Sequence, residues 1–227
     1  MKVINRKTAA GSAAFFASAA LAVTMVPGSA VASGDDHHDD GHGHSHDHDH
    51  GNTARAHLDP LNSSGVSGHA EVKARYRKLD IEVDARGLAA DLPHAQHIHY
   101  GEQARNECPT VSMDDANGDF RLETGEGLPA YGPIAVSLTT SGPTGAGSGL
   151  AVERFPTAPD GKIDYERTTH SSKAVARAIR NGEAVVVIHG VDYNGNGTYD
   201  FDSAGESDLD PTLPAEATDP AVCGVLR

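Results

Sequence analysis

Hydrophobic and polar residues alternate along residues 71–89, which read EVKARYRKLDIEVDARGLA. The stretch contains two alternating runs. In the first, every second residue is Val72, Ala74 and Tyr76, and in the second it is Leu79, Ile81, Val83 and Ala85. A period of two is typical of strands that bury one face. The stretch therefore predicts a β-hairpin with one face in the core.

Further short apolar runs follow toward the C-terminus, and glycine or proline separates nearly all of them. The strands predicted from these runs are Ile134 to Thr139, Gly149 to Arg154, Ile163 to Arg167, Ala184 to His189 and Ala221 to Leu226. One segment, residues 171–182, has helical features instead: a serine N-cap, Val175 and Ile179 four apart, and Gly182 after its end. Many short strands and one short helix predict an all-β fold, a Greek-key antiparallel β-sandwich or barrel.

The N-terminal part of the chain lacks this pattern. Residues 1–32 combine basic residues, an apolar run and a small-residue cleavage site, which predicts a secretory signal peptide. No later segment is apolar over the roughly 20 residues of a membrane helix. We therefore expect a protein that is secreted, extracellular or in the cell envelope, without a membrane span, whose single domain covers residues 55–227.

Residues 33–54 are rich in histidine and aspartate and hold almost no apolar side chain, so we expect a disordered tail. Imidazole suits zinc, copper and nickel, which makes the tail a candidate metal-collecting arm. A charged, solubilising spacer is the alternative. The tail histidines are His37, His38, His42, His44, His46, His48 and His50, and zinc is expected only here.

The net charge narrows the partners that the domain can have. The chain carries −14; the signal has three basic residues and the tail six aspartates, which leaves −11 for the remainder. Such a surface repels phosphate and attracts cations, so nucleic acid is an unsuitable partner. The expected partners are metal ions and, as a further option, another extracellular protein.

The stretch HAQHIHY at residues 94–100 carries the candidate chemistry of the domain. On a strand, His97 and His99 point to the same face and form a chelate. A third nitrogen from a neighbouring strand would complete a copper or zinc site, and His189 lies in the strand candidate AVVVIHG. The alternative is that these rings are bonded to the backbone at a sheet end.

The chain has two cysteines, Cys108 and Cys223. In an exported protein, two thiols far apart in sequence usually pair, so a disulfide is expected.

Together these motifs resemble the copper/zinc superoxide dismutases. The family's HxxHxH is mirrored by His94, His97 and His99, and VVVIHG resembles the strand that supplies another copper ligand. The resemblance implies that His97, His99 and His189 are copper ligands, that His94 is structural, and that the cysteine pair is the family's intrasubunit disulfide. The chain is also similar to chordin-type (CHRD) domains of secreted proteins, including actinobacterial ones, through its HIHYG.

The chain departs from the dismutase pattern in two places. No histidine lies between Cys108 and Tyr131, so the bridging histidine and the remaining zinc histidines have no counterpart. The arginine that guides superoxide is also missing from ATDPAVCG, which reads Asp219 and Pro220 near its place. An acidic surface would repel the superoxide anion.

Two acidic stretches resemble calcium loops in their spacing. The candidate ligands of the first are Asp115, Asn117, Asp119, Glu123 and Glu126. Those of the second are Asp192, Asn194, Asn196 and Asp200. Phe120 stands where the first loop needs glycine, and Ser203 stands where the second needs glutamate. Polar turns are the alternative for both.

The sequence thus favours a secreted copper-binding β-sandwich protein with a metal-collecting arm. One alternative is an enzyme, a copper-only dismutase. The other is a CHRD-type interaction module with calcium-binding loops. Whether the protein catalyses any reaction is left open at this point.

Overall fold

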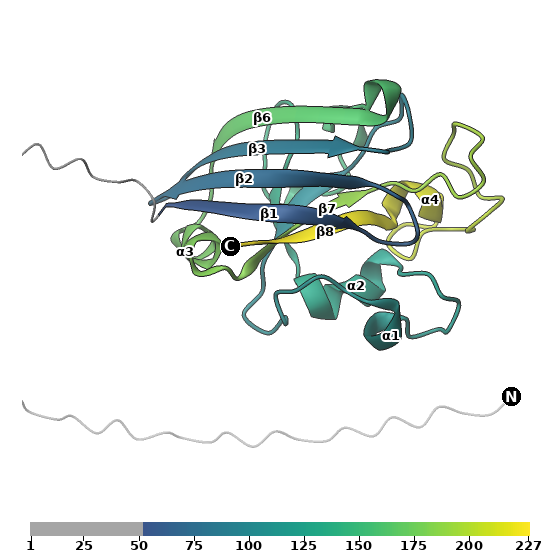
Figure 1. Cartoon of the computed structure of the whole chain (residues 1–227), viewed down its shortest axis with the longest axis horizontal. Helices are drawn as coiled ribbons and strands as arrows, with labels where there is room; N and C mark the ends of the chain where they lie inside the picture. Colours follow the sequence, from purple (N-terminus) through teal and green to yellow (C-terminus); the bar gives the residue numbers. More distant parts are fainter. Residues whose placement is uncertain (1–51) are drawn as a thin grey trace, which may run out of the picture. The chain divides into compact units, whose positions relative to one another are not determined.

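Eight strands form one antiparallel sheet in the computed structural model, which describes residues 52–227 (Figure 1). The strands are β1 (Thr53–Pro60), β2 (Ser67–Arg75), β3 (Lys78–Arg86), β4 (Gln96–His99), β5 (Ile134–Ser137), β6 (Lys162–His170), β7 (Ala184–His189) and β8 (Pro220–Leu226). Their order across the sheet is β5-β4-β7-β8-β1-β2-β3-β6. The predicted fold class, an antiparallel all-β sandwich or barrel, is confirmed.

The sheet curls until its two edge regions touch. In β6, Thr169 Oγ1 lies 2.7 Å from Thr144 Oγ1, and the hydroxyl of Tyr165 donates to the carbonyl of Thr139 at 3.1 Å. Thr139 and Thr144 belong to the segment that follows β5, the opposite edge strand. These bonds therefore close the curled sheet along one side.

The main core lies inside the curl, between the two halves of the sheet. The β2–β3 hairpin, predicted from its alternation, contributes Val72, Leu79 and Ile81, and the facing strands contribute Ile98 and Val186. Both faces of β7 are buried, because a second apolar cluster lies on its other side. This second cluster consists of Tyr131, Val185, Val187 and Cys223.

Helices are more numerous than the sequence predicted. They are α1 (Val111–Asp114), α2 (Thr124–Tyr131), α3 (Lys173–Asn181) and α4 (Ala215–Thr218), with 3₁₀ turns η2 (Ala146–Ser148), η3 (Val152–Arg154) and η4 (Pro159–Gly161). Only α3 was predicted, with its Ser172 cap and left-handed Gly182. Helix α2 contains two glycines and Pro129, whose low helix propensities prevent its prediction from the sequence.

The predicted strand from Gly149 to Arg154 is wrong. This segment forms 3₁₀ turns, in which Gly149 N–H donates to the Ala146 carbonyl at 3.0 Å and Ala151 N–H to the Ser148 carbonyl at 3.2 Å. Because local acceptors satisfy its amides, the segment adds no strand to the sheet. Its apolar side chains instead line a pocket, described below.

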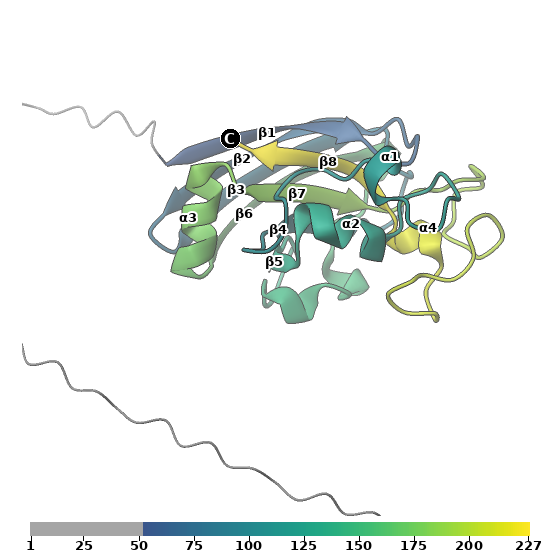
Figure 2. The same cartoon turned by 90° about the horizontal axis from the view of Figure 1, so that it is seen from below.

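Helices α1 and α2 lie over β7 and β8, on the side away from β2 and β3 (Figures 1 and 2). A disulfide between Cys108 and Cys223 ties this covering segment to β8, as the sequence had suggested. The segment that holds α1 and α2 is therefore covalently fixed to the sheet.

The predicted signal peptide and most of the predicted tail, including all seven tail histidines, lie outside the described residues. Strand β1 begins at Thr53, inside the stretch 33–54 that the sequence analysis placed in the tail. None of the helices between residues 52 and 227 has the length and apolar character needed to cross a bilayer.

Candidate metal centre

Three histidines lie on one face of two neighbouring strands. His97 and His99 are in β4, and His189 ends β7, which pairs with β4 in antiparallel register. Because side chains alternate along a strand, Ile98 points the opposite way, into the main core. All three histidines are buried.

One nitrogen of each ring is held by a backbone carbonyl. The pairs are His97 Nε2 with Gly149 at 3.2 Å, His99 Nδ1 with Gly132 at 2.8 Å, and His189 Nδ1 with Thr218 at 2.6 Å. Since a carbonyl can only accept, these three ring nitrogens carry the protons. Each ring is thereby fixed in orientation and in tautomer, as in histidines that ligate metals.

The other nitrogen of each ring, His97 Nδ1, His99 Nε2 and His189 Nε2, is buried and has no hydrogen-bond partner. The three side chains each bring one ring nitrogen within 4.8 Å of the others. No other group of three or more His, Cys, Asp or Glu side chains between residues 52 and 227 converges in this way. Three buried lone pairs without donors fit a metal ion, which would satisfy all of them.

Gly132 shows how the covering segment positions His99. It ends α2 with φ +83°, a conformation that L side chains rarely adopt, and its carbonyl accepts from His99 Nδ1. A Cβ at this position would lie 2.9 Å from the backbone nitrogen of Gly101. Glycine is therefore required at this turn.

Burial keeps the cluster neutral. It lowers the pKa of His97 well below the usual range, and the neighbouring rings of His189 and His99 lower it further. Burial lowers the pKa of His99 to about 3 and that of His189 to about 4. At neutral pH all three rings therefore offer lone pairs rather than positive charge.

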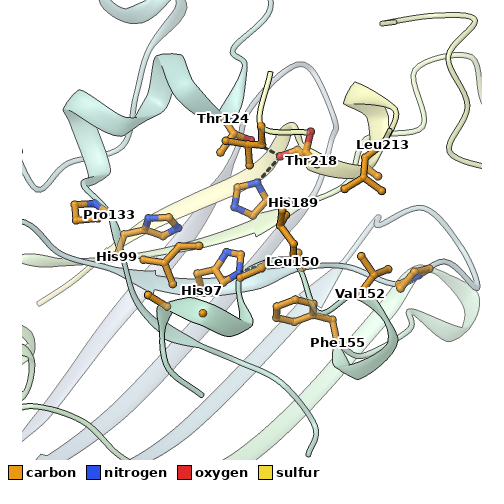
Figure 3. Close-up of a pocket in the computed structure, with 18 of the residues that line it drawn as sticks. His97, His99, Thr124, Pro133, Leu150, Val152, Phe155, His189, Leu213 and Thr218 are labelled. Atoms are coloured by element: carbon orange, nitrogen blue, oxygen red, sulfur yellow. Dashed lines mark hydrogen bonds between the residues drawn. The ribbon is translucent and has the colours of Figure 1, made fainter. Parts of the chain in front are cut away.

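The histidines lie at the floor of a pocket of about 480 Å³ (Figure 3). In this view Phe155 and Val152 lie to one side of the rings, and Thr124 and Thr218 lie above His189. The walls come from the segment before β4, from α2 to β5, from the η2–η3 turns, and from α4 with the chain before it. No Asp, Glu, Lys or Arg lines this pocket of the described domain.

His94 lies beside the cluster but differs from it. Its Nδ1 is 2.8 Å from the carbonyl of His189 and its Nε2 is 3.1 Å from that of Ala89. With a carbonyl at each nitrogen, the ring has no free lone pair directed at the other histidines. His94 therefore lies between two backbone carbonyls and is not one of the three converging histidines.

The first acidic loop uses its side chains to bind its own backbone. Asp115 accepts from the amides of Gly118 and Phe120, and Glu126 accepts from Ala116 and Glu123. The remaining candidates do the same: Asn117 accepts from the Asp119 amide, Asp119 from the Arg121 amide and Glu123 from the Glu126 amide. Phe120 takes the positive φ, 64°, that a glycine would normally take in such a loop.

The second acidic loop is organised in the same way. Asp192 accepts from the amides of Gly195 and Gly197, and Asn196 donates to Asp200. Asn194 accepts from the Asn196 amide. In neither loop do three His, Cys, Asp or Glu side chains converge as the three histidines do.

Glu216 holds the second loop from outside it, and the sequence analysis missed this residue. It is fully buried in α4, and its two carboxylate oxygens accept from the amides of Tyr193 at 3.0 Å and Asp200 at 2.9 Å. In the first loop Glu126 bonds equivalent amides from within the loop. Because Glu216 is distant in sequence, spacing alone could not have identified it.

Arg121 is the basic residue that approaches Asp219, near the place where the dismutase arginine is missing. Its guanidinium lies 2.7 Å from Asp219 Oδ2 and 2.7 Å from Glu123 Oε1. Burial raises the pKa of Asp219 to about 6, although the bond to Arg121 opposes the shift. Arg121 is therefore engaged by acidic partners and does not face the pocket.

The sequence matches no known family pattern and no curated protein. Among the solved structures that resemble it is superoxide dismutase 5 of Candida albicans, described with Cu(II). The identity is 16%, the TM-score is 0.33, and the match covers 63% of this chain and 84% of that one. At this level of similarity, the conclusions about the site depend on the site's own geometry.

Proposed function

We propose that the protein is a secreted copper-binding β-sandwich protein, in which His97, His99 and His189 hold the ion. The observation that supports this most directly is the set of three buried ring nitrogens that have no hydrogen-bond partner. Leaving one buried polar atom unpaired costs about 1–3 kcal/mol, so three at one point call for a common ligand. Copper forms the most stable complexes with imidazole among the divalent first-row metals.

The protein supplies the orientation and the neutrality of the three rings. Backbone carbonyls hold the single N–H of each ring away from the shared centre, and burial keeps the rings neutral. Bound copper would add an electron-accepting centre that can change oxidation state. In the same proposal, the histidine-rich tail at residues 33–54 collects metal for this site.

The alternatives from the sequence are less well supported. A dismutase is expected to steer an anion, whereas no cationic side chain lines this pocket of the described domain. In a CHRD-type interaction module the histidines would be structural, with each lone pair used in the fold. Calcium at the acidic loops stays a separate proposal, since their carboxylates already bind backbone amides.

Calorimetric titration of residues 52–227 tests the proposal without metal binding by the tail. We expect one equivalent of copper(II), and an affinity lowered at least tenfold by His97→Gln, His99→Gln or His189→Gln, because each removes one ligand. His69→Gln, which changes an exposed side chain on β2, is the matched control and should leave the affinity unchanged. Equal affinity in all variants would exclude this site. Tighter binding of zinc than of copper would make zinc, rather than copper, the ion assigned to it.

A further inference from the structure

The pocket above the histidines has an unusual surface for a metal site. At about 480 Å³ it has the volume of a small-molecule site, far more than a water or a diatomic molecule needs. Its lining contains no charged side chain. Leu, Val, Ile, Phe, Pro and Ala residues form most of the wall, and the three neutral imidazoles form the floor.

Exposed apolar side chains gather at this pocket. The described residues include eight large hydrophobic side chains that are exposed, and half of them line it: Leu128, Leu150, Val152 and Leu209. Their exposed fractions are between 39% and 47%. Apolar side chains held half exposed around a concave surface indicate a binding site rather than a random surface feature.

The polar groups of the walls are already used within the fold. The hydroxyl of Thr124 donates to the Thr218 carbonyl, and that of Thr218 donates to Ser207. The hydroxyl of Tyr199 lies 3.2 Å from His94 Nδ1. A ligand in the pocket therefore meets apolar walls, and its polar contact is available only at the floor.

We infer that the pocket binds a small, neutral and largely apolar molecule that presents one nitrogen or oxygen lone pair to the metal. An aromatic nitrogen heterocycle or a phenol has this chemistry. The apolar body would contact Leu150, Val152 and Phe155 from the η2–η3 segment, and Leu209 and Leu213 from the chain before α4. The contact between the ligand and the metal rests on the proposed copper site. The preference of the walls for an apolar ligand does not rest on it.

The test compares 4-phenylimidazole with imidazole on the full chain loaded with one equivalent of copper(II). Both probes offer the same donor nitrogen, so their difference reports the apolar wall. We expect 4-phenylimidazole to bind at least tenfold more tightly. Leu150→Asp and Leu209→Asp, which place a charge on separate walls, should each reduce this ratio to below threefold.

Met113→Asp is the matched control, because Met113 is an exposed apolar side chain outside the pocket. It should leave the ratio unchanged. Copper held by the tail would respond to none of these substitutions. Circular dichroism of each variant verifies that the fold is intact, and two independent wall variants keep the test decisive if one fails to fold.

Equal affinity for the two probes, or a ratio insensitive to both wall variants, would overturn the inference. Tighter binding of azide than of 4-phenylimidazole would replace the apolar ligand by a small anion. The same probe pair with the metal-free chain in EDTA separates the two proposals. Selectivity that persists there shows that the apolar walls act without metal, and the calorimetric titration with copper(II) decides separately whether the histidines hold the ion.

Discussion

The two halves of the sheet use the same backbone pairing but differ in what covers them. Strands β2 and β3 alternate buried and exposed residues, so one face meets the core and the other meets water. Strands β4 and β7 are buried at every position. Their second face is covered by loops and short helices, and this is the face that carries the three histidines. Polar side chains there need partners within the protein.

Among the substitutions considered, loss of the disulfide should lower the free energy of unfolding most, because the disulfide holds the cover of the β4–β7 half. The Cys108→Ala, Cys223→Ala double variant releases the covering segment from β8, and the free energy of unfolding should fall by about 4 kcal/mol, because the bridge closes a loop of 115 residues. Urea denaturation measures the change. A loss below 1 kcal/mol would show that the cover is held by packing alone.

Acid should destabilise the covered half through its histidines. The pKa of His99 is lowered to about 3 in the folded state, whereas an unfolded histidine titrates near 6.5. Below pH 6.5 the unfolded chain therefore binds a proton that the folded chain does not, and stability falls as the pH falls. From pH 7 to 5 this amounts to about 2 kcal/mol for one histidine.

The measurement is the free energy of unfolding of the metal-free protein at both pH values. His99→Gln should lose about 2 kcal/mol less than the parent between them. His69→Gln is the comparison from the exposed half, where the side chain is 69% accessible and pairs with Asp84. If both substitutions changed the acid sensitivity equally, the neutral, buried state of His99 would be contradicted.

Glu216→Gln tests the buried support of the second acidic loop. A glutamine amide nitrogen cannot accept, so one of the amides of Tyr193 and Asp200 loses its partner. We expect a loss of about 1–2 kcal/mol in the free energy of unfolding, with copper affinity unchanged within twofold. A tenfold change in copper affinity would mean that the loop and the histidines act together.

The smallest effect is expected on the exposed face of the hairpin. Glu82 faces solvent in β3, so Glu82→Gln should change the free energy of unfolding by less than about 0.5 kcal/mol. Thermal melting is sufficient to detect a larger change. A loss above 1 kcal/mol would indicate that this face is covered by something that the chain alone does not show.

The difference between the half of the sheet with one exposed face and the half buried on both faces explains which elements the sequence could predict. Alternation identified the β2–β3 hairpin, and the run Ala184 to His189 was found with the bounds of β7. The sequence pattern does not predict β1, and the segment around Leu150, predicted as a strand, forms 3₁₀ turns. Such turns depend on local amides and on the pocket that they line, and neither leaves a periodic pattern.

The site was predicted in part for a similar reason. Two histidines one residue apart on a strand must share a face, so His97 and His99 could be paired from spacing. His189 was a candidate because it lies in another strong strand, and the resemblance added its role as a copper ligand. The carbonyls of Gly132, Gly149 and Thr218, which fix the rings, come from loops and carry no side-chain signal. The role of Glu216 could not be predicted either, because the amides that it binds lie in a loop distant in sequence.

Electron paramagnetic resonance of residues 52–227 with one equivalent of copper(II) tests the metal site most directly. We predict a single spectrum with imidazole nitrogen couplings, and a clear change of that spectrum in His189→Gln, whose ring comes from the neighbouring strand. A spectrum without nitrogen couplings, or one identical in the parent and in His189→Gln, would contradict a copper site at these three histidines.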